Sequence, residues 1–397
     1  MIIRKLEQSE HITTRRLWEE VFSEDTKAFL DYYYYIKAAK NRIYAVEEDE
    51  KICSMLQLNP YQIRLENESF PAEYIVAVAT KKEYRSRGYM RALLNTVLGQ
   101  MYSEKMPFTF LMPAAEAIYS PYDFRYIYDQ CVQEVKTDGM TGLNFERAAQ
   151  GEGILEFSDA GLWDAEEMAA FFETHFSDSW QVYAQRDTAY YQTMILEQQS
   201  EKGGVRLMRE NGVLKGFYAY ALEEGLEVRE PLYLKQYAGE FERSLRMLLD
   251  QKNAQKTDKN GQSIQESVKI YASLNKKSSK MRPVIMARII CLPEFLKAMM
   301  VSEKETLACS FAVIDSILYK NSRVWKLTSA QGETEIHVRE TEDSQGVFPI
   351  ADLTEYLFGR ISLEELCGRD GVICTDELGE ELEKIEKLTR VYFNEVV

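Results

Sequence analysis

One order of secondary-structure elements occurs twice in this chain, and the repeat limits the possible folds more than any other feature of the sequence. The order is a β-hairpin, a third strand, a helix with one apolar face and a fourth strand. The first copy places these elements at 42–46, 52–58, 74–79, 90–101 and 108–112. The second copy, which is degraded, places them at 205–209, 213–220, 228–234, 241–249 and 268–274. The repeat predicts two similar units of strands and helices in tandem.

The repeated order of elements ends at about residue 286, and a different order of strands and helices follows. Short strands are predicted at 311–318, 324–327, 335–338 and 347–350, and helical segments at 351–358 and 363–367. The stretch 377–390 is acidic and helix-biased, and it leads to an apolar chain end. At ~150 residues per domain, the 397 residues allow two or three domains. We therefore expect a mixed α+β protein with domains at 1–148, 149–285 and 286–397.

Composition excludes several classes of protein. Lys and Arg number 48 against 64 Asp and Glu, and the net charge of −16 opposes nonspecific binding to nucleic acid or anionic membranes. No apolar run approaches the ~18 residues that span a bilayer, so we expect no membrane span. Six cysteines without a CxxC pair, in a chain that begins without an apolar leader, indicate reduced thiols and a cytoplasmic location. The three histidines lie far apart and form no HExxH motif, so we expect no metal site.

The strongest local signal is a basic loop between the third strand and the helix of the first copy. The loop Lys81–Arg87 ends at Gly88, and the helix follows directly. Unpaired backbone N–H groups at a helix start, together with the helix dipole, form a cradle for an anion such as a pyrophosphate. Arg85, Arg87 and Arg91 add positive charge, and Gly88 allows close approach of the backbone. The alternative is an ordinary basic loop that caps a core helix.

The run Arg85-x-x-Gly88-x-Met90, which follows a Val-Ala-Val-Ala strand, resembles the RxxGxG/A acyl-CoA motif of the GNAT acetyltransferase superfamily. Met90 stands where that motif has a small residue. The degraded second copy, a third domain that resembles a sterol carrier protein, and Ala117-Ile118-Tyr119 make the chain similar to the Eis-like (enhanced intracellular survival) branch. This resemblance covers essentially the whole chain.

The resemblance implies tandem GNAT units, of which only the first binds acetyl-CoA. Strand backbone would hold the pantetheine arm, the loop and helix start would hold the pyrophosphate, and two alanines would lie near the acyl end. These positions are Val78, Ala79, Thr80, Arg85, Ser86, Arg87, Gly88, Tyr89, Met90, Arg91, Ala114 and Ala115. The family often has Ser-Glu in place of Ala114-Ala115 and Gly-Gly in place of Glu116-Ala117, so this chain departs from the pattern there.

Acetyl transfer to an amine needs a base for the ammonium proton and an acid for the departing thiolate. The resemblance assigns the acid to Tyr119, with Tyr126 as the alternative, and the base to the α-carboxylate of Val397. An α-carboxylate has a pKa of ~3.5, which burial would raise, although most chain ends fray and have no function. The resemblance also makes three aromatic residues candidate walls of an acceptor site: Phe29, Tyr33 and Tyr34.

The expected activity is acetyl-CoA-dependent transfer to a primary amine of an aminoglycoside, a polyamine or a lysine side chain, by direct attack on the thioester. The resemblance further implies a homo-oligomer, a hexamer. One alternative is a noncatalytic binding protein that holds a lipid or small ligand in its third domain and uses the GNAT units as a scaffold. A second alternative is an acetyltransferase that acts on lysines of a partner protein.

Overall fold

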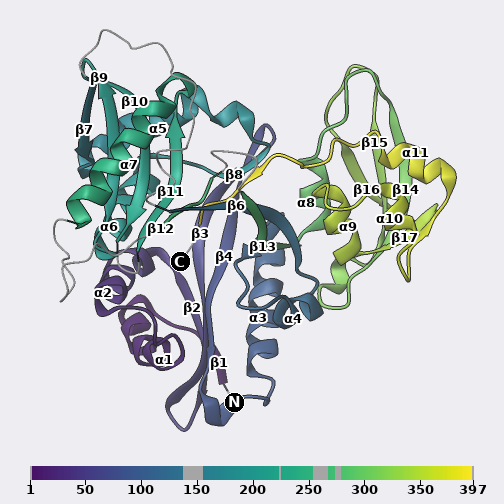
Figure 1. Ribbon diagram of the computed structural model, residues 1–397. Coiled ribbons are helices and arrows are strands. Elements are labelled where there is room, and N and C mark those ends of the chain that lie inside the picture. The colour runs from purple at the N-terminus through teal and green to yellow at the C-terminus, as the bar shows by residue number, and fades with distance from the viewer. Residues whose placement is uncertain (1, 137–154, 223–224, 254–266, 273–278, 396–397) are drawn as a thin grey trace.

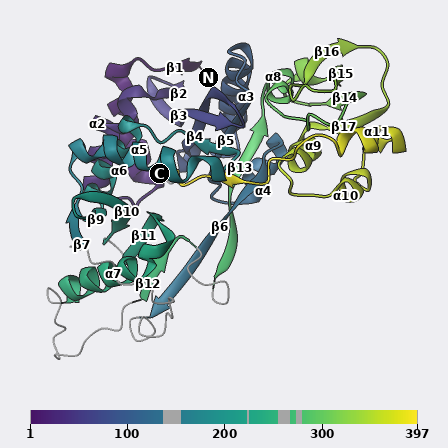
Figure 2. The ribbon, with the colours of Figure 1, turned by 90° about the horizontal axis from the view of Figure 1, so that it is seen from above.

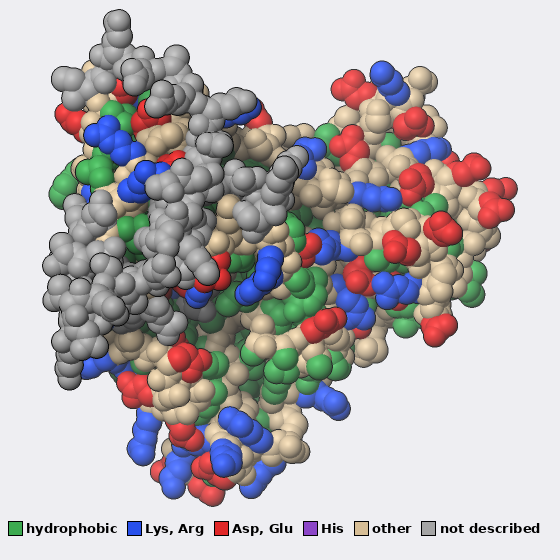
Figure 3. All heavy atoms as spheres, in the orientation of Figure 1, with side chains coloured by type: hydrophobic (Ala, Val, Ile, Leu, Met, Phe, Trp, Pro, Cys, Tyr) green, Lys and Arg blue, Asp and Glu red, His purple; other side chains and the backbone are tan. Residues whose placement is uncertain are grey.

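A computed structural model describes residues 2–136, 155–222, 225–253, 267–272 and 279–395, which form three parts (Figure 1). The two N-terminal parts share one large sheet, and the C-terminal part has a smaller sheet of its own. Acidic and basic side chains are interspersed over the visible face of the C-terminal part (Figure 3). The expected boundary at 148/149 lies outside the described residues.

The first part contains the predicted hairpin, strand, helix and strand. Its elements are β1 (Ile2–Lys5), α1 (Arg15–Val21), α2 (Lys27–Tyr35), β2 (Arg42–Glu48), β3 (Lys51–Leu65), β4 (Glu68–Thr80), α3 (Tyr89–Ser103), β5 (Phe108–Leu111) and α4 (Glu116–Tyr119). Helices α1 and α2 lie on one face of the sheet and α3 on the other (Figure 1). Helix α3 packs there because its apolar residues recur every three or four positions: Leu93, Leu94, Val97, Leu98 and Met101 are fully buried.

The second part repeats this order in its backbone. Its elements are β7 (Leu155–Asp159), α5 (Ala165–His175), β8 (Val182–Ala184), α6 (Thr188–Ser200), β9 (Gly204–Glu210), β10 (Val213–Ala221), β11 (Leu226–Tyr233), α7 (Ala238–Asn253) and β12 (Ser267–Ile270). Ala77 in β4 and Glu230 in β11 both adopt a positive φ, 51° and 46°, at a register shift against the preceding strand. The shared bulge shows that the two parts are copies of one fold.

Strand β6 (Arg125–Lys136) joins the two parts. It pairs with β12 of the second part and with β13 (Lys280–Ile289), which in turn pairs with β5 of the first part. The long sheet therefore runs in the order β1-β2-β3-β4-β5-β13-β6-β12-β11-β10-β9-β7 (Figure 2). The expected boundary at 285/286 falls inside β13.

The C-terminal part is a five-stranded sheet with helices beside it. Its elements are α8 (Leu292–Lys297), β14 (Leu307–Ile314), β15 (Val324–Ser329), β16 (His337–Thr341), β17 (Gly346–Pro349), α9 (Ile350–Leu357), α10 (Leu363–Cys367), β18 (Ile373–Cys374) and α11 (Asp376–Leu382). The strand predicted at 311–318 ends at Ile314, because the Asp315 carboxylate accepts the backbone N–H groups of Ile317 and Leu318 and turns the chain. The helix predicted over 377–390 ends at Leu382.

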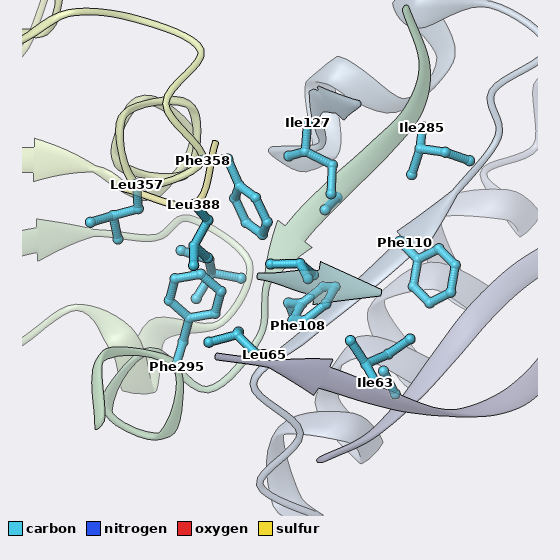
Figure 4. Packing of buried hydrophobic residues seen from close by; sticks show 14 of the residues in the cluster. Ile63, Leu65, Phe108, Phe110, Ile127, Ile285, Phe295, Leu357, Phe358 and Leu388 are labelled. Carbon is cyan, nitrogen blue, oxygen red and sulfur yellow. The ribbon is translucent and has the colours of Figure 1, made fainter. Parts of the chain in front are cut away.

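Aromatic packing fixes the C-terminal part to the first part. The ring centroid of Phe108 in β5 lies 6.1 Å from that of Phe295 in α8 and 5.9 Å from that of Phe358, the residue after α9 (Figure 4). After α11 the chain returns between the other two parts (Figure 1). There β19 (Val391–Tyr392) pairs with β8, and β8 pairs with β3. No helix within the described ranges is long and apolar enough to span a membrane.

Candidate functional site

Strands β4 and β5 separate at the centre of the first part. The described residues of these parallel strands pair at one position, Tyr74 with Phe110, although β4 continues to Thr80. The bulge at Ala77 turns β4 within this stretch. Val78, Ala79 and Thr80 therefore lie on a strand edge that β5 leaves open. Such an edge binds an extended ligand through backbone hydrogen bonds, as an added strand does.

The basic loop follows this edge and ends at α3. Ser86 and Gly88 both have positive φ, 63° and 82°, and no side chain caps the helix start at Gly88. A Cβ at Gly88 would meet no atom within 4 Å, so the backbone conformation, not space, requires glycine there. The guanidinium of Arg85 donates to the Thr80 carbonyl at 3.2 Å, and that of Arg87 donates to the Glu83 carbonyl at 3.1 Å. The loop thus brings the predicted phosphate-binding residues together on an exposed surface.

The remaining predicted donor residues lie near this loop. Tyr89 is buried and donates its hydroxyl hydrogen bond to Glu48, whereas Arg91 is exposed. Met90 is half-buried against the core. Ala114 and Ala115 are exposed between β5 and α4.

Tyr119 ends α4, and its ring packs edge-on against Phe124 at 6.0 Å. The side chain is buried, and burial raises the pKa of its phenol to about 12. The phenol is therefore protonated at neutral pH. Tyr126, the alternative acid, lies on β6 and is half-buried. Burial also raises the pKa of Tyr126.

A cavity of about 560 Å³ lies where the first part, the second part and the C-terminal segment meet. Its wall includes residues 59–62 of β3, 71–73 of β4, residues of α6, the segment 394–395, and Ile36, Lys37, Lys40 and Asn41. Glu73 of this wall directly precedes Tyr74, where the pairing of β4 with β5 ends. The cavity thus borders β4 at 71–73, where the Thr109 hydroxyl of β5 still donates to the Glu73 carbonyl. The open edge at 78–80 lies further along the same strand, beyond Tyr74.

Four buried polar atoms of cavity-lining residues have no hydrogen-bond partner among the described residues. They are Asn41 Oδ1, Asn59 Nδ2, Glu73 Oε2 and Gln198 Oε1. Buried polar groups in native proteins are almost always hydrogen-bonded, so atoms left without partners in a cavity wall indicate a site for water or a polar ligand. Three of the four are acceptors, and such a wall suits a ligand rich in N–H and O–H groups.

The three aromatic residues expected at the acceptor site are buried in the core and are not among the cavity-lining residues: Phe29, Tyr33 and Tyr34. Tyr33 donates to Asn59 Oδ1 at 2.9 Å and accepts from Asn41 Nδ2 at 3.0 Å. The Tyr34 hydroxyl lies 2.9 Å from that of Thr14. Tyr33 therefore contacts the cavity through the two asparagines that it holds.

The C-terminal segment reaches the cavity through fixed contacts. The Phe393 ring stacks on Phe110 of β5 at 4.6 Å. Glu395 is buried in the wall, where Tyr190 donates to it at 3.0 Å and the Arg186 guanidinium lies 3.3 Å away. Val397, the predicted base, lies outside the described residues.

Tyr74 of β4 directly follows Glu73 of the cavity wall. It is fully buried, and burial raises the pKa of its phenol. Tyr61, Glu395 and Tyr119 lie close enough to affect that pKa as well. Tyr74 and the four cavity residues were missed by sequence reasoning because they come from distant segments and form no motif.

Residues 2–127 match the family described as acetyltransferase (GNAT) domain. The N-terminal part is a GNAT acetyltransferase domain. This domain makes the chain an N-acetyltransferase. Residues 292–394 match the family described as sterol carrier protein domain. The expected GNAT fold of the N-terminal part and the expected likeness of the C-terminal part to a sterol carrier protein are confirmed.

Solved structures share the fold over nearly the whole chain. A probable N-acyltransferase of Enterococcus faecalis is 19% identical, with a TM-score of 0.79 and 99% of each chain covered. A GCN5-related N-acetyltransferase from Anabaena variabilis is 16% identical, with a TM-score of 0.75 and 98% of each chain covered. Eis1 from Mycobacterium abscessus is 13% identical, with a TM-score of 0.68 and 99% of each chain covered. No curated protein matches the chain.

Proposed function

We propose that this N-acetyltransferase moves the acetyl group of acetyl-CoA to a primary amine of a small, donor-rich molecule. The observation that carries the proposal is an exposed basic loop that follows an open strand edge, with a polar cavity that borders an earlier stretch of the same strand β4. The loop suits a pyrophosphate, the edge suits the pantetheine arm, and the cavity suits the amine. Domains at 1–148, 149–285 and 286–397, a cytoplasmic location and a homo-oligomer, hexameric by resemblance, stay predictions.

The donor would be held by the first part alone. Backbone N–H groups at the start of α3 and the side chains of Arg85, Arg87 and Arg91 would bind its phosphates. The second part has no such loop, because α7 begins at Ala238 directly after Lys235–Tyr237, and its glycine, Gly239, lies inside the helix. The exposed basic loop favours catalysis over the alternative of a noncatalytic lipid carrier, since a scaffold has no use for it.

The acceptor would enter the cavity. A lysine side chain offers one ammonium group, whereas a polyamine or an aminoglycoside offers several donors to the three unpartnered acceptor atoms. The cavity therefore favours these small molecules over a lysine of a partner protein. Within the described residues, no group of three or more His, Cys, Asp or Glu side chains is placed to hold a metal ion.

The chemistry is direct transfer. The amine nitrogen attacks the thioester carbonyl, the new N–C bond forms, and the C–S bond breaks. Tyr119, protonated at neutral pH, would give its proton to the departing thiolate. The base that takes the ammonium proton is predicted to be the α-carboxylate of Val397, and the buried position of Glu395 in the cavity wall supports this assignment.

Removing charge from the loop should weaken donor binding. We expect Arg85→Ala with Arg87→Ala to raise the KM for acetyl-CoA roughly tenfold at low salt, and by less at high salt, because salt screens exposed charges. The control is Lys304→Ala with Arg339→Ala, which removes the same charge from exposed positions of the C-terminal part. Steady-state kinetics at two ionic strengths test this, and an unchanged KM would contradict the phosphate cradle.

Gln198→Met should raise the KM for the acceptor roughly tenfold, because it removes an acceptor atom from the cavity wall at similar volume. The KM for acetyl-CoA should stay unchanged. The control is Gln199→Met at the neighbouring exposed position of α6, which is not among the cavity-lining residues. CoA release with polyamines, aminoglycosides and lysine peptides provides the readout. Release with lysine peptides alone would favour a protein acceptor, and no release with any amine would favour the binding protein.

A further inference from the structure

The turn that follows Tyr119 is held by two arginines. Arg125 donates to the Ser120 carbonyl at 3.2 Å and to the Phe124 carbonyl at 2.8 Å. Arg288 of β13 donates through Nε to the Tyr122 carbonyl at 2.9 Å. Three carbonyls within five residues of Tyr119 are thus fixed by guanidinium groups.

Both arginines are paired with carboxylates of the C-terminal part. Arg288 Nη2 lies 2.6 Å from Asp315 Oδ1, and both side chains are fully buried. Arg125 Nε lies 3.7 Å from Glu355 Oε2 of α9. Each arginine therefore connects the turn after Tyr119 to the C-terminal part.

The Asp315 carboxylate is itself rigidly held. It accepts the backbone N–H groups of Ile317 and Leu318 at 3.0 and 2.8 Å and the Asn321 side-chain amide at 2.9 Å. Asn321 also donates to the Ile290 carbonyl at the end of β13, at 2.8 Å. A buried arginine takes its orientation from such a fixed, hydrogen-bonded partner.

Tyr119 needs external support of this kind. Helix α4 is a single turn of 4 residues, and no side chain caps its start at Ala115. One turn of helix has little stability of its own, because nucleation costs more than one turn recovers. The orientation of the phenol thus depends on contacts made by the residues that follow it.

We propose that the sterol-carrier-like domain positions Tyr119 for catalysis: Asp315 and Glu355 orient Arg288 and Arg125, which fix the turn at 120–124. The inference rests on the proposed function, in which Tyr119 is the acid. Arg288 and Arg125 are positioning residues. The C-terminal domain thereby serves acetyl transfer directly, as part of the support of the active site.

The test compares contacts that reach the turn with one that does not. Glu355→Gln and Asp315→Asn should each lower kcat about tenfold and leave the KM for acetyl-CoA and for the acceptor unchanged. The control is Asp129→Asn, which breaks the 2.8 Å ion pair between β6 and Arg360 of the C-terminal part without touching the turn. It should keep the wild-type kcat.

Combination with Tyr119→Phe separates positioning from general destabilisation. If Glu355 acts through Tyr119, Glu355→Gln should lower kcat no further in the Tyr119→Phe background. Thermal unfolding identifies any variant that does not fold. If Asp315→Asn does not fold, Glu355→Gln alone tests the inference, because Glu355 is only half-buried. Folded variants with wild-type kcat, or equal losses in both backgrounds, would overturn the inference. Full turnover by Tyr119→Phe would instead refute the acid assignment, and the positioning inference with it.

Discussion

Replacing Tyr119 by phenylalanine should lower kcat by about 100- to 10,000-fold, the usual contribution of a general acid. The substitution removes the hydroxyl and keeps the ring that packs on Phe124. The fold and the KM for acetyl-CoA should therefore change little. Single-turnover measurements at saturating substrates would show whether the lost rate lies in the chemical step.

The pH dependence provides a second measurement on Tyr119. Burial raises the pKa of the phenol to about 12 in the free enzyme, above the usual value near 10. A neutral acid works while it holds its proton, so kcat/KM should show no fall assignable to this group until the pH approaches 12. A tyrosine with an ordinary pKa would cause a fall near pH 10.

Tyr126→Phe is the matched control, because Tyr126 is the alternative acid and is half-buried on β6. We expect this variant to retain most of its turnover. The opposite result, with full activity in Tyr119→Phe and a large loss in Tyr126→Phe, would move the acid role to Tyr126.

The order of elements could be predicted because each has a local cause. The apolar spacing from Leu93 to Met101 determines the buried face of α3, and Gly88 marks its start. The acidic turn at 49–50 places the hairpin of β2 and β3. The basic loop was equally visible, since its residues are contiguous and its backbone geometry follows from the strand-to-helix turn.

Long-range pairing could not be predicted in this way. Strand β13 lies between β5 and β6, although about 170 residues separate it from β5 in the chain. The cavity has the same origin: Asn41, Asn59 and Gln198 come from three separate segments. No local pattern indicates that their polar side chains meet.

The four consecutive tyrosines of α2, Tyr32 to Tyr35, could not be placed from the sequence alone. A helix points four consecutive side chains in different directions, and only Tyr35 of the run is mainly exposed, at 71%. Tyr33 is fully buried, and its ring lies 4.6 Å from that of Trp18. Which side of α2 faces the core depends on α1, and sequence spacing alone does not give that packing.

The position of the terminal carboxylate should matter as much as the phenol of Tyr119. Deleting Val397 moves that carboxylate back by about 3.5 Å, one residue of extended chain. Displacement by even about 1 Å can cost a reacting group 100-fold in rate, so we expect kcat to fall at least that far. Stacking of Phe393 on Phe110 and pairing of Glu395 with Arg186 should still hold the segment in place.

Val397→Ala is the control for this deletion, because it keeps the carboxylate at its position and removes only methyl groups. It should retain nearly full kcat, whereas the deletion should not. Acetyl-CoA binding, measured by calorimetry, should be the same in both variants, since the donor is held by the loop and strand edge of the first part. A folded deletion variant with wild-type turnover would show that the proton leaves by another route, for which the carboxylate of Glu395 in the cavity wall is the nearest candidate on this segment.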